Sequence, residues 1–148
     1  MPHAPPTSPL VQAEPVPGAV PVRLVLTTLP ASADAAAVAR DLVERRLAAC
    51  VGIGAGVRSV YRWKGGVEDE AEVPLVIKTT DERIAALETR LREVHPYEVP
   101  EFVVLQAGAS EAYGAWLVDA VAGDAPAAAS EPGTPGQPQS QPERLKPT

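Results

Sequence analysis

The stretch SVYRWKGGVEDEAEVPLVIKTT (residues 59–80) contains two β-like runs on either side of a pair of glycines. In the first run, Tyr61 and Trp63 fall on one face of an extended chain, because side chains alternate between the two faces of a strand. Gly65-Gly66 is a two-residue hairpin signal between such runs. The stretch therefore predicts an antiparallel β-hairpin.

The two predicted strands are long, from Cys50 to Lys64 and from Val67 to Thr80. A two-residue turn at the glycines would set Arg62 opposite Asp69, which pairs opposite charges across the strands. At about 3.3 Å per residue, the first strand would span roughly 40–50 Å, whereas most strands have about 5–6 residues. Helices of about fourteen residues are roughly 20 Å long and could not cover such a ribbon.

An uncovered ribbon that carries aromatic side chains and open strand edges favours association with other chains. We therefore expect an oligomer. The alternative is a hairpin that bends back on its own sheet at one of its breakers, which are Gly52, Gly54, Gly56 and Pro74.

The segments around the hairpin complete an alternating pattern of strands and helices. Before it we predict a strand at 21–29 and a helix at 33–48 with Ser32 as N-cap. After it we predict a helix at 82–94 capped by Asp81, a strand at 102–105 and a helix at 111–121. This order predicts an α+β fold, a ferredoxin-like β-α-β-β-α-β sandwich with a long central hairpin and an extra C-terminal helix. Because many unrelated functions share this fold, it implies no activity.

Both ends of the chain have a different composition from its middle. Seven of the seventeen prolines lie in residues 1–21 and six in residues 124–148. Such segments bury too little apolar surface to offset their chain entropy. We therefore expect a disordered Pro-rich tail at 1–20, a folded domain at 21–123, and a second disordered tail, rich in Pro, Ala and Gln, at 124–148.

Composition excludes some partners. The formal net charge of −6 and the scattered basic residues argue against nucleic acid. There is no run of about eighteen apolar residues for a membrane span, and no secretory signal pattern. Cys50 is the single cysteine, which fits a reducing compartment. We expect a cytoplasmic protein with no membrane partner.

Three blocks of the sequence resemble the CutA family of divalent-cation tolerance proteins. They are RRLAACV (45–51), the hairpin stretch 59–80, and VHPYEVPEFVVL (94–105). The resemblance implies a ferredoxin-like fold, a tight homotrimer built by extending sheets across subunits, kinship of shape with PII signalling proteins, and association with divalent metals, notably copper. It implies no established enzyme reaction. Gly52 and Ala55 depart from the family pattern, which commonly has an Asn and a proline in this segment.

Cys50 and His95 are the natural metal candidates, because copper and zinc prefer thiolate and imidazole donors. Neither makes a site alone, so Glu98 or Glu101 would have to complete it, with ligands brought together by the trimer. Two structural alternatives stay open. Cys50 would serve equally as a small buried apolar residue, and His95, which precedes a proline, as a hydrogen-bonding residue.

A second candidate site lies on the hairpin. Glu68, Glu70 and Glu72 recur with period two and share a face with Tyr61 and Trp63 in the predicted register. The resemblance places family signature residues at these aromatic positions and at Glu72, Lys78, His95, Tyr97 and Glu98. We expect an inter-subunit cleft lined by Tyr61, Trp63, Glu72, Lys78, Tyr97 and Glu101. The alternative is a solvated charged face, in which exposed ion pairs add about 0–1 kcal/mol each.

Three functions follow as hypotheses. The first is a homotrimer for divalent-metal tolerance that binds copper weakly, and the second is a PII-like module that binds a small metabolite or a partner protein in the cleft. The third is an enzyme that uses His95 and Glu98 as acid and base. No nucleophile elbow or phosphate loop supports catalysis, so we expect no enzyme activity.

Overall fold

The computed structural model describes residues 18–123. Nearly all of both expected tails therefore lies outside the described residues. The elements are β1 (Val20–Pro30), α1 (Ala35–Glu44), β2 (Cys50–Ile53), β3 (Val57–Trp63), β4 (Gly66–Thr79), a 3-10 turn η1 (Asp81–Arg83), α2 (Ile84–Val94), β5 (Val103–Ala109) and α3 (Glu111–Ala120). Within these residues, no helix is long and apolar enough to cross a membrane.

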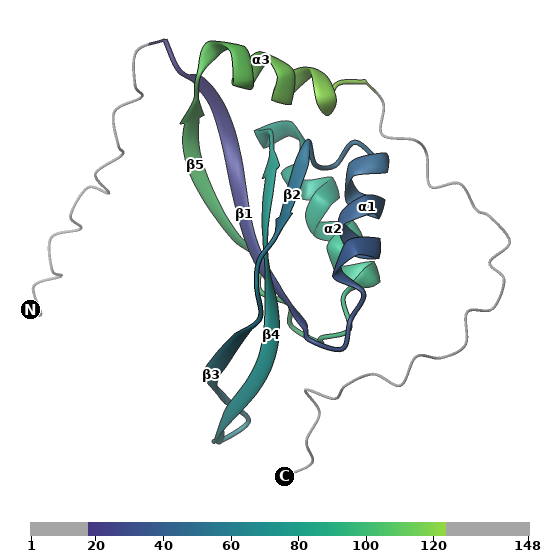
Figure 1. Cartoon of the computed structure of the whole chain (residues 1–148), viewed down its shortest axis with the longest axis vertical. Helices are drawn as coiled ribbons and strands as arrows, with labels where there is room; N and C mark the ends of the chain where they lie inside the picture. The colour runs from purple at the N-terminus through teal and green to yellow at the C-terminus, as the bar shows by residue number, and fades with distance from the viewer. Residues whose placement is uncertain (1–17, 124–148) are drawn as a thin grey trace, which may run out of the picture.

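One antiparallel sheet organises the domain. Its strands lie in the order β2-β4-β1-β5, and β3 also pairs with β4. Helices α1 and α2 lie together on one face, while α3 crosses the end of the sheet where β1 begins (Figure 1). This is the predicted α+β arrangement, ferredoxin-like with an extra C-terminal helix.

The main core lies between the sheet and the two helices. Val25 and Leu29 of β1 are fully buried there against Leu42 of α1 and Leu87 and Leu91 of α2. These residues follow period two on the strand and helical spacing on α2, as amphipathic elements require. The sequence pattern therefore identifies the face of each element that is buried.

The hairpin differs from the prediction in register by two residues. Its turn consists of Lys64 and Gly65, which both have positive φ angles of 45° and 81°, so Trp63 pairs with Gly66. Such a turn matches the twist of the strands and favours glycine at a left-handed position. Arg62 therefore faces Val67 and not Asp69, although a shift of two residues leaves every side chain on its predicted face.

The long first strand is interrupted at its glycines. Ile53 pairs with Leu75 and Val57 pairs with Glu72, so four steps on one strand oppose three on the other. This is a β-bulge, which bends and twists a strand locally. The N–H of Gly54 donates to the carbonyl of Pro74 at 2.9 Å. Beyond this point β3 and the first half of β4 project past the helix-covered sheet (Figure 1).

Two predicted helix starts were placed wrongly. Helix α1 begins at Ala35, and the Asp34 carboxylate, not Ser32, caps it by accepting from the Ala37 N–H at 3.0 Å. Asp81 does not cap α2 but opens the 3-10 turn and pairs with Arg23. An N-cap side chain must lie next to the N–H groups of the first helical turn, and Asp34, directly before Ala35, occupies that position.

The predicted helix 33–48 also ends early. Helix α1 ends at Glu44, and Arg46 takes a left-handed φ of 58°. The chain reverses there, and Leu47 enters the core. The free energy gained by burying the Leu47 side chain in the core outweighs that of continuing the helix beyond Glu44.

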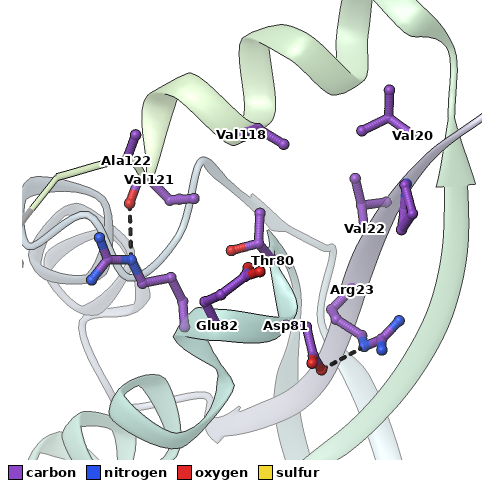
Figure 2. A pocket seen from close by; sticks show the side chains of 11 residues that line it. Val20, Val22, Arg23, Thr80, Asp81, Glu82, Val118, Val121 and Ala122 are labelled. Atoms are coloured by element: carbon purple, nitrogen blue, oxygen red, sulfur yellow. Dashed lines mark hydrogen bonds and ion pairs between the residues drawn. The ribbon is translucent and has the colours of Figure 1, made fainter.

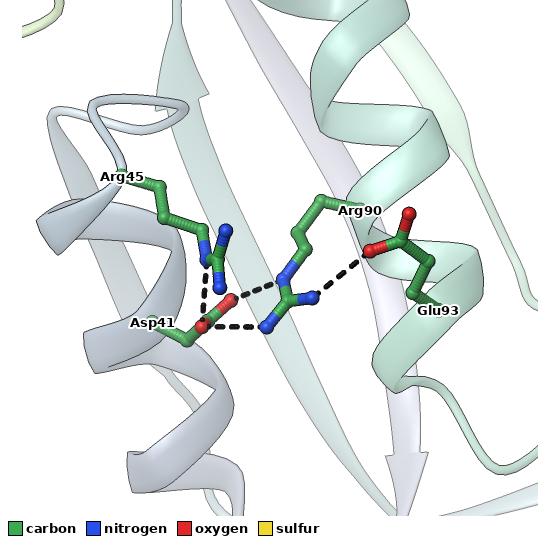
Figure 3. A network of polar contacts seen from close by, with 4 residues as sticks. All are labelled: Asp41, Arg45, Arg90 and Glu93. Atoms are coloured by element: carbon green, nitrogen blue, oxygen red, sulfur yellow. Dashed lines mark hydrogen bonds and ion pairs between the residues drawn. The ribbon is translucent and has the colours of Figure 1, made fainter. Parts of the chain in front are cut away.

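An ion-pair network joins α1 to α2 (Figure 3). The guanidinium of Arg90 contacts both oxygens of Asp41 at 2.8 Å, and Arg45 Nε reaches the same carboxylate at 2.9 Å. These hydrogen bonds, that of Arg90 foremost, hold the pKa of Asp41 below its usual value. The network fixes the two helices relative to each other on the sheet.

Candidate functional site

A buried tyrosine–glutamate pair lies where the projecting hairpin joins the body of the domain. The Tyr97 hydroxyl donates to Glu72 Oε2 at 2.7 Å, and the Glu72 residue is only 2% exposed. The carboxylate comes from β4 and the phenol from the loop after α2. A buried carboxylate needs such donors, because desolvation without hydrogen bonds would be costly.

His95 lies beside this pair, and both of its ring nitrogens are engaged. Nε2 lies 2.7 Å from the Thr28 carbonyl oxygen, and Nδ1 accepts the backbone N–H of Tyr97 at 3.1 Å. A carbonyl can only accept and a backbone N–H can only donate, so the proton is on Nε2 and the ring is neutral. His95 could therefore bind a metal only after one of these hydrogen bonds broke.

The tip of the hairpin is linked to the same loop. Lys64 Nζ lies 3.8 Å from Glu98 Oε2 and 5.6 Å from the centroid of the Trp63 ring. Tyr61 pairs with Glu68 across the strands, which confirms that the aromatic and acidic side chains share a face. Glu101, predicted for the cleft, is exposed in the loop that precedes β5.

Lys78 lies apart from this group in the single chain. Its Nζ donates to the Tyr113 hydroxyl at 3.1 Å and lies 5.3 Å from the centroid of that ring. The hydrogen bond to Tyr113, followed by its electrostatic attraction, raises the pKa of Lys78. Tyr113 also packs against Trp116, with ring centroids 5.4 Å apart.

Sequence reasoning missed Tyr113 as a partner of Lys78. The two residues are 35 positions apart, and the available signal was the spacing of two aromatic residues on one face of the last helix.

The three metal candidates do not meet within one chain. Their separation can be measured along β1. Cys50 pairs across the sheet with Lys78, which pairs with Leu24 of β1, whereas His95 forms a hydrogen bond to Thr28 of β1. Four residues of strand separate these positions, or about 13 Å. Within residues 18–123, no group of three or more His, Cys, Asp and Glu side chains could hold a metal ion. A single described chain therefore does not fit a copper site, and the assignment of Cys50, His95 and Glu98 stays a prediction.

The face of the sheet opposite α1 and α2 is apolar and partly uncovered. Val76, Val103 and Leu105 lie on it and are 37%, 44% and 43% exposed. Their pairing with Leu26 and Leu24 of β1 places them on this face, because Val25 between these leucines points into the main core. Exposed apolar patches in soluble proteins mark contact surfaces for protein, membrane or ligand.

Comparisons with known proteins agree with these features. Residues 23–120 match the family model described as CutA1 divalent ion tolerance protein. The chain is 44% identical over 95 residues to the divalent-cation tolerance protein CutA of Thermus thermophilus, which covers 64% of this chain and 92% of the relative. It is 41% identical over 104 residues to human protein CutA, covering 69% of this chain and 58% of the relative.

Solved structures show the same likeness. The structure described as PII-like protein CutA from Nostoc sp. PCC 7120 in apo form superposes with a TM-score of 0.63 at 38% identity, covering 68% of this chain and 97% of the other. Since the family model spans most of the described residues, the chain belongs to the CutA1 family of divalent ion tolerance proteins.

Proposed function

We propose that this protein acts in divalent-cation tolerance as a homotrimer, with copper as its ion and with metal ligands drawn from more than one copy. Family membership supports the tolerance role. The observation that carries the assembly is the uncovered apolar face bordered by two open strand edges.

The two edges are complementary. In the described sheet, β5 pairs only with β1, and β2 pairs only with β4. Neither strand contains a charged residue or a proline (VVLQAGA and CVGI), although proteins usually protect open edges with these residues. Pairing of β5 in one copy with β2 of the next would satisfy both edges. This is a head-to-tail contact, which forms a closed ring where the rotation between copies is a whole fraction of a turn, and the family resemblance implies three copies.

The metal ligands must then come from several chains. Each copy has one cysteine and one core histidine, and the structure separates Cys50 from His95. Copper and zinc sites need three or four donors. With one cysteine in each copy, a site with several thiolate ligands requires that Cys50 residues from several copies meet at the rotation axis of the assembly.

Native mass and copper binding test both parts of the proposal. We expect wild-type protein at micromolar concentration to have three times the mass of one chain and to retain copper in equilibrium dialysis. Cys50→Ser should lose copper but remain a trimer. Leu105→Arg places a charge on the uncovered face and should give monomers that do not retain copper. A folded wild-type monomer would refute the assembly, and unchanged copper binding by a Cys50→Ser, His95→Ala double variant would remove both ligands.

A PII-like role is the second candidate. Lys78, which pairs with Leu24 on the uncovered face, contacts Tyr113, and Tyr113 packs against Trp116. Aromatic rings beside a cation suit an anionic metabolite. We expect a thermal-shift screen of anionic metabolites, nucleotides included, to give a stabilising ligand whose effect Lys78→Ala abolishes and Lys64→Ala preserves. A ligand that stabilises Lys78→Ala equally would contradict this role.

We propose that the protein is not an enzyme and works in the cytoplasm. Glu98 is paired with Lys64, and His95 has no unbonded ring nitrogen, so neither is poised for proton transfer. The single cysteine supports a reducing compartment. Turnover of any substrate that disappears in His95→Ala would disprove the first statement, and a secreted, oxidised native form would disprove the second.

A further inference from the structure

The outer part of the central hairpin projects from the domain (Figure 1) and is joined to it over a short length. Strand β1 pairs with β4 no further than Glu72, and one more backbone hydrogen bond, at 3.1 Å, ties Ala71 to Ala31. Beyond these residues, the two strands of the hairpin pair only with each other within the described chain. We propose that residues 57–70, which we call the arm, pivot as one unit about the segment Gly54-Ala55-Gly56.

Only one of the two glycines in this pivot segment is required by packing. A Cβ atom on Gly54 would lie 2.7 Å from Pro74 Cγ, which is too close, whereas the nearest atom to a Cβ on Gly56 would be the Glu72 carbonyl oxygen at 3.9 Å. Gly56 does not have a positive φ angle either, so neither space nor conformation requires glycine there. A glycine costs backbone entropy on folding. Gly56 therefore gives the backbone a freedom of rotation that the observed conformation does not need.

The parts on either side of the pivot segment are each braced internally. In the arm, β3 pairs with β4 along its whole length, and Arg58 forms an ion pair with Asp69 across the two strands. In the body, Arg83 of η1 donates to the carbonyl of Val121 at the end of α3 at 2.9 Å (Figure 2). Motion of the arm relative to the body is therefore concentrated at the segment that joins them.

An exposed ion pair links the tip of the arm to the body. Lys64 Nζ lies 3.8 Å from Glu98 Oε2, and the two side chains are 44% and 59% exposed. Exposed ion pairs are weak, so this contact favours the position of the arm seen here, the closed position, without fixing it. The pair acts as a catch that opens and closes.

A pivoting arm changes the width of the candidate cleft. Tyr61 and Trp63 belong to the arm, whereas Tyr97 and Glu101 belong to the body. Movement of the arm therefore brings the two sides of the cleft together or separates them. This consequence rests on the proposed cleft, whereas the pivot itself rests on the fold of the single chain.

Distances between two spin labels on the full chain test this proposal. In a Cys50→Ser background, Val60→Cys labels the arm and Ala86→Cys labels α2, both at exposed positions. Dilution with unlabelled chains leaves one labelled copy in each assembly. We expect two populations of distances, with the catch closed and open. Glu98→Gln breaks the ion pair and should raise the ratio of open to closed about two- to fivefold, whereas Glu101→Gln, in the same loop, should leave it unchanged.

Two variants of the pivot segment complete the test. Ala55→Pro should leave a single population, because proline fixes φ and the Ala55 N–H makes no hydrogen bond within residues 18–123. Gly56→Ala should narrow both populations and preserve the native mass.

The pivot is overturned by one population in the wild type that Glu98→Gln leaves unchanged, by equal effects of Glu98→Gln and Glu101→Gln, or by two unaltered populations in Ala55→Pro. A lower native mass in Gly56→Ala would also overturn it, by showing that a second copy packs against this glycine. Because both labels lie in one chain, a wild-type monomer would refute the proposed assembly while the distances still test the pivot.

Discussion

Replacement of Gly114 by alanine tests how α3 is held against the sheet. Gly114 is buried in α3 and faces Val20 of β1. A methyl group added there would lie 2.6 and 2.8 Å from the two Val20 methyls and closer still to Val20 Cβ. Carbon atoms pack at about 3.5–4.0 Å, so the strand and the helix would have to separate by roughly 1 Å.

The net effect is a balance of two terms. In an unconstrained helix, glycine to alanine stabilises by about 1 kcal/mol, whereas overpacking typically costs about 1–3 kcal/mol. Because a Cβ atom is fixed by the backbone, rotation of Val20 cannot relieve its closest contact. We expect Gly114→Ala to lower the free energy of unfolding by about 1–2 kcal/mol and to weaken the contact of Tyr113 with Lys78.

Urea denaturation at fixed protein concentration, followed by tryptophan fluorescence, measures this cost in three backgrounds. Val20→Ala removes the two methyl contacts but keeps Cβ, so Gly114→Ala should remain destabilising there. Val20→Gly removes every contact, and Gly114→Ala should then be neutral or stabilising. If Gly114→Ala stabilises the wild-type chain, or if Val20→Ala rescues it fully, the close approach of α3 to β1 is not the reason for the glycine.

Three further predictions concern polar groups that are buried or partly buried. Because the Asp41 carboxylate has a lowered pKa in the folded chain, its hydrogen bonds stabilise the fold above the usual pKa of 3.8, and this contribution is lost as pH falls through the folded-state pKa. Asp41→Asn should lower the free energy of unfolding by about 1–3 kcal/mol at pH 7 and flatten the acid limb of a profile of stability against pH. An unchanged profile would refute the role of Arg90. Among residues 18–123, the buried Thr27 hydroxyl has no hydrogen-bond partner, so Thr27→Val should raise the free energy of unfolding by about 1 kcal/mol. A lower midpoint in urea would contradict this. Tyr97→Phe leaves the buried Glu72 carboxylate without the phenol and should destabilise by about 1–3 kcal/mol; equal stability of the variant in calorimetry would show that other donors suffice.

The hairpin shows how far local pattern can predict structure. Alternation placed Tyr61 and Glu68 on a common face, and this held although the register was wrong by two residues. The error arose at the turn, because the glycine pair was assigned as the two turn residues while Lys64 takes one of the left-handed positions. The family resemblance named Glu72 and Tyr97 as signature residues, but only the structure shows that they bond to each other.

The sequence by itself determined the order of the main strands and helices, which face of each is buried, and to which family the chain is similar, since periodicity and local motifs report on neighbouring residues. The tertiary structure decided which side chains meet across elements, as with Tyr97 and Glu72 at 25 positions apart, Lys78 and Tyr113 at 35, and Arg90 and Asp41 at 49. It also separated Cys50 from His95 within one chain. These outcomes depend on how whole elements pack, and packing is fixed by the sum of many distant contacts that no local pattern records.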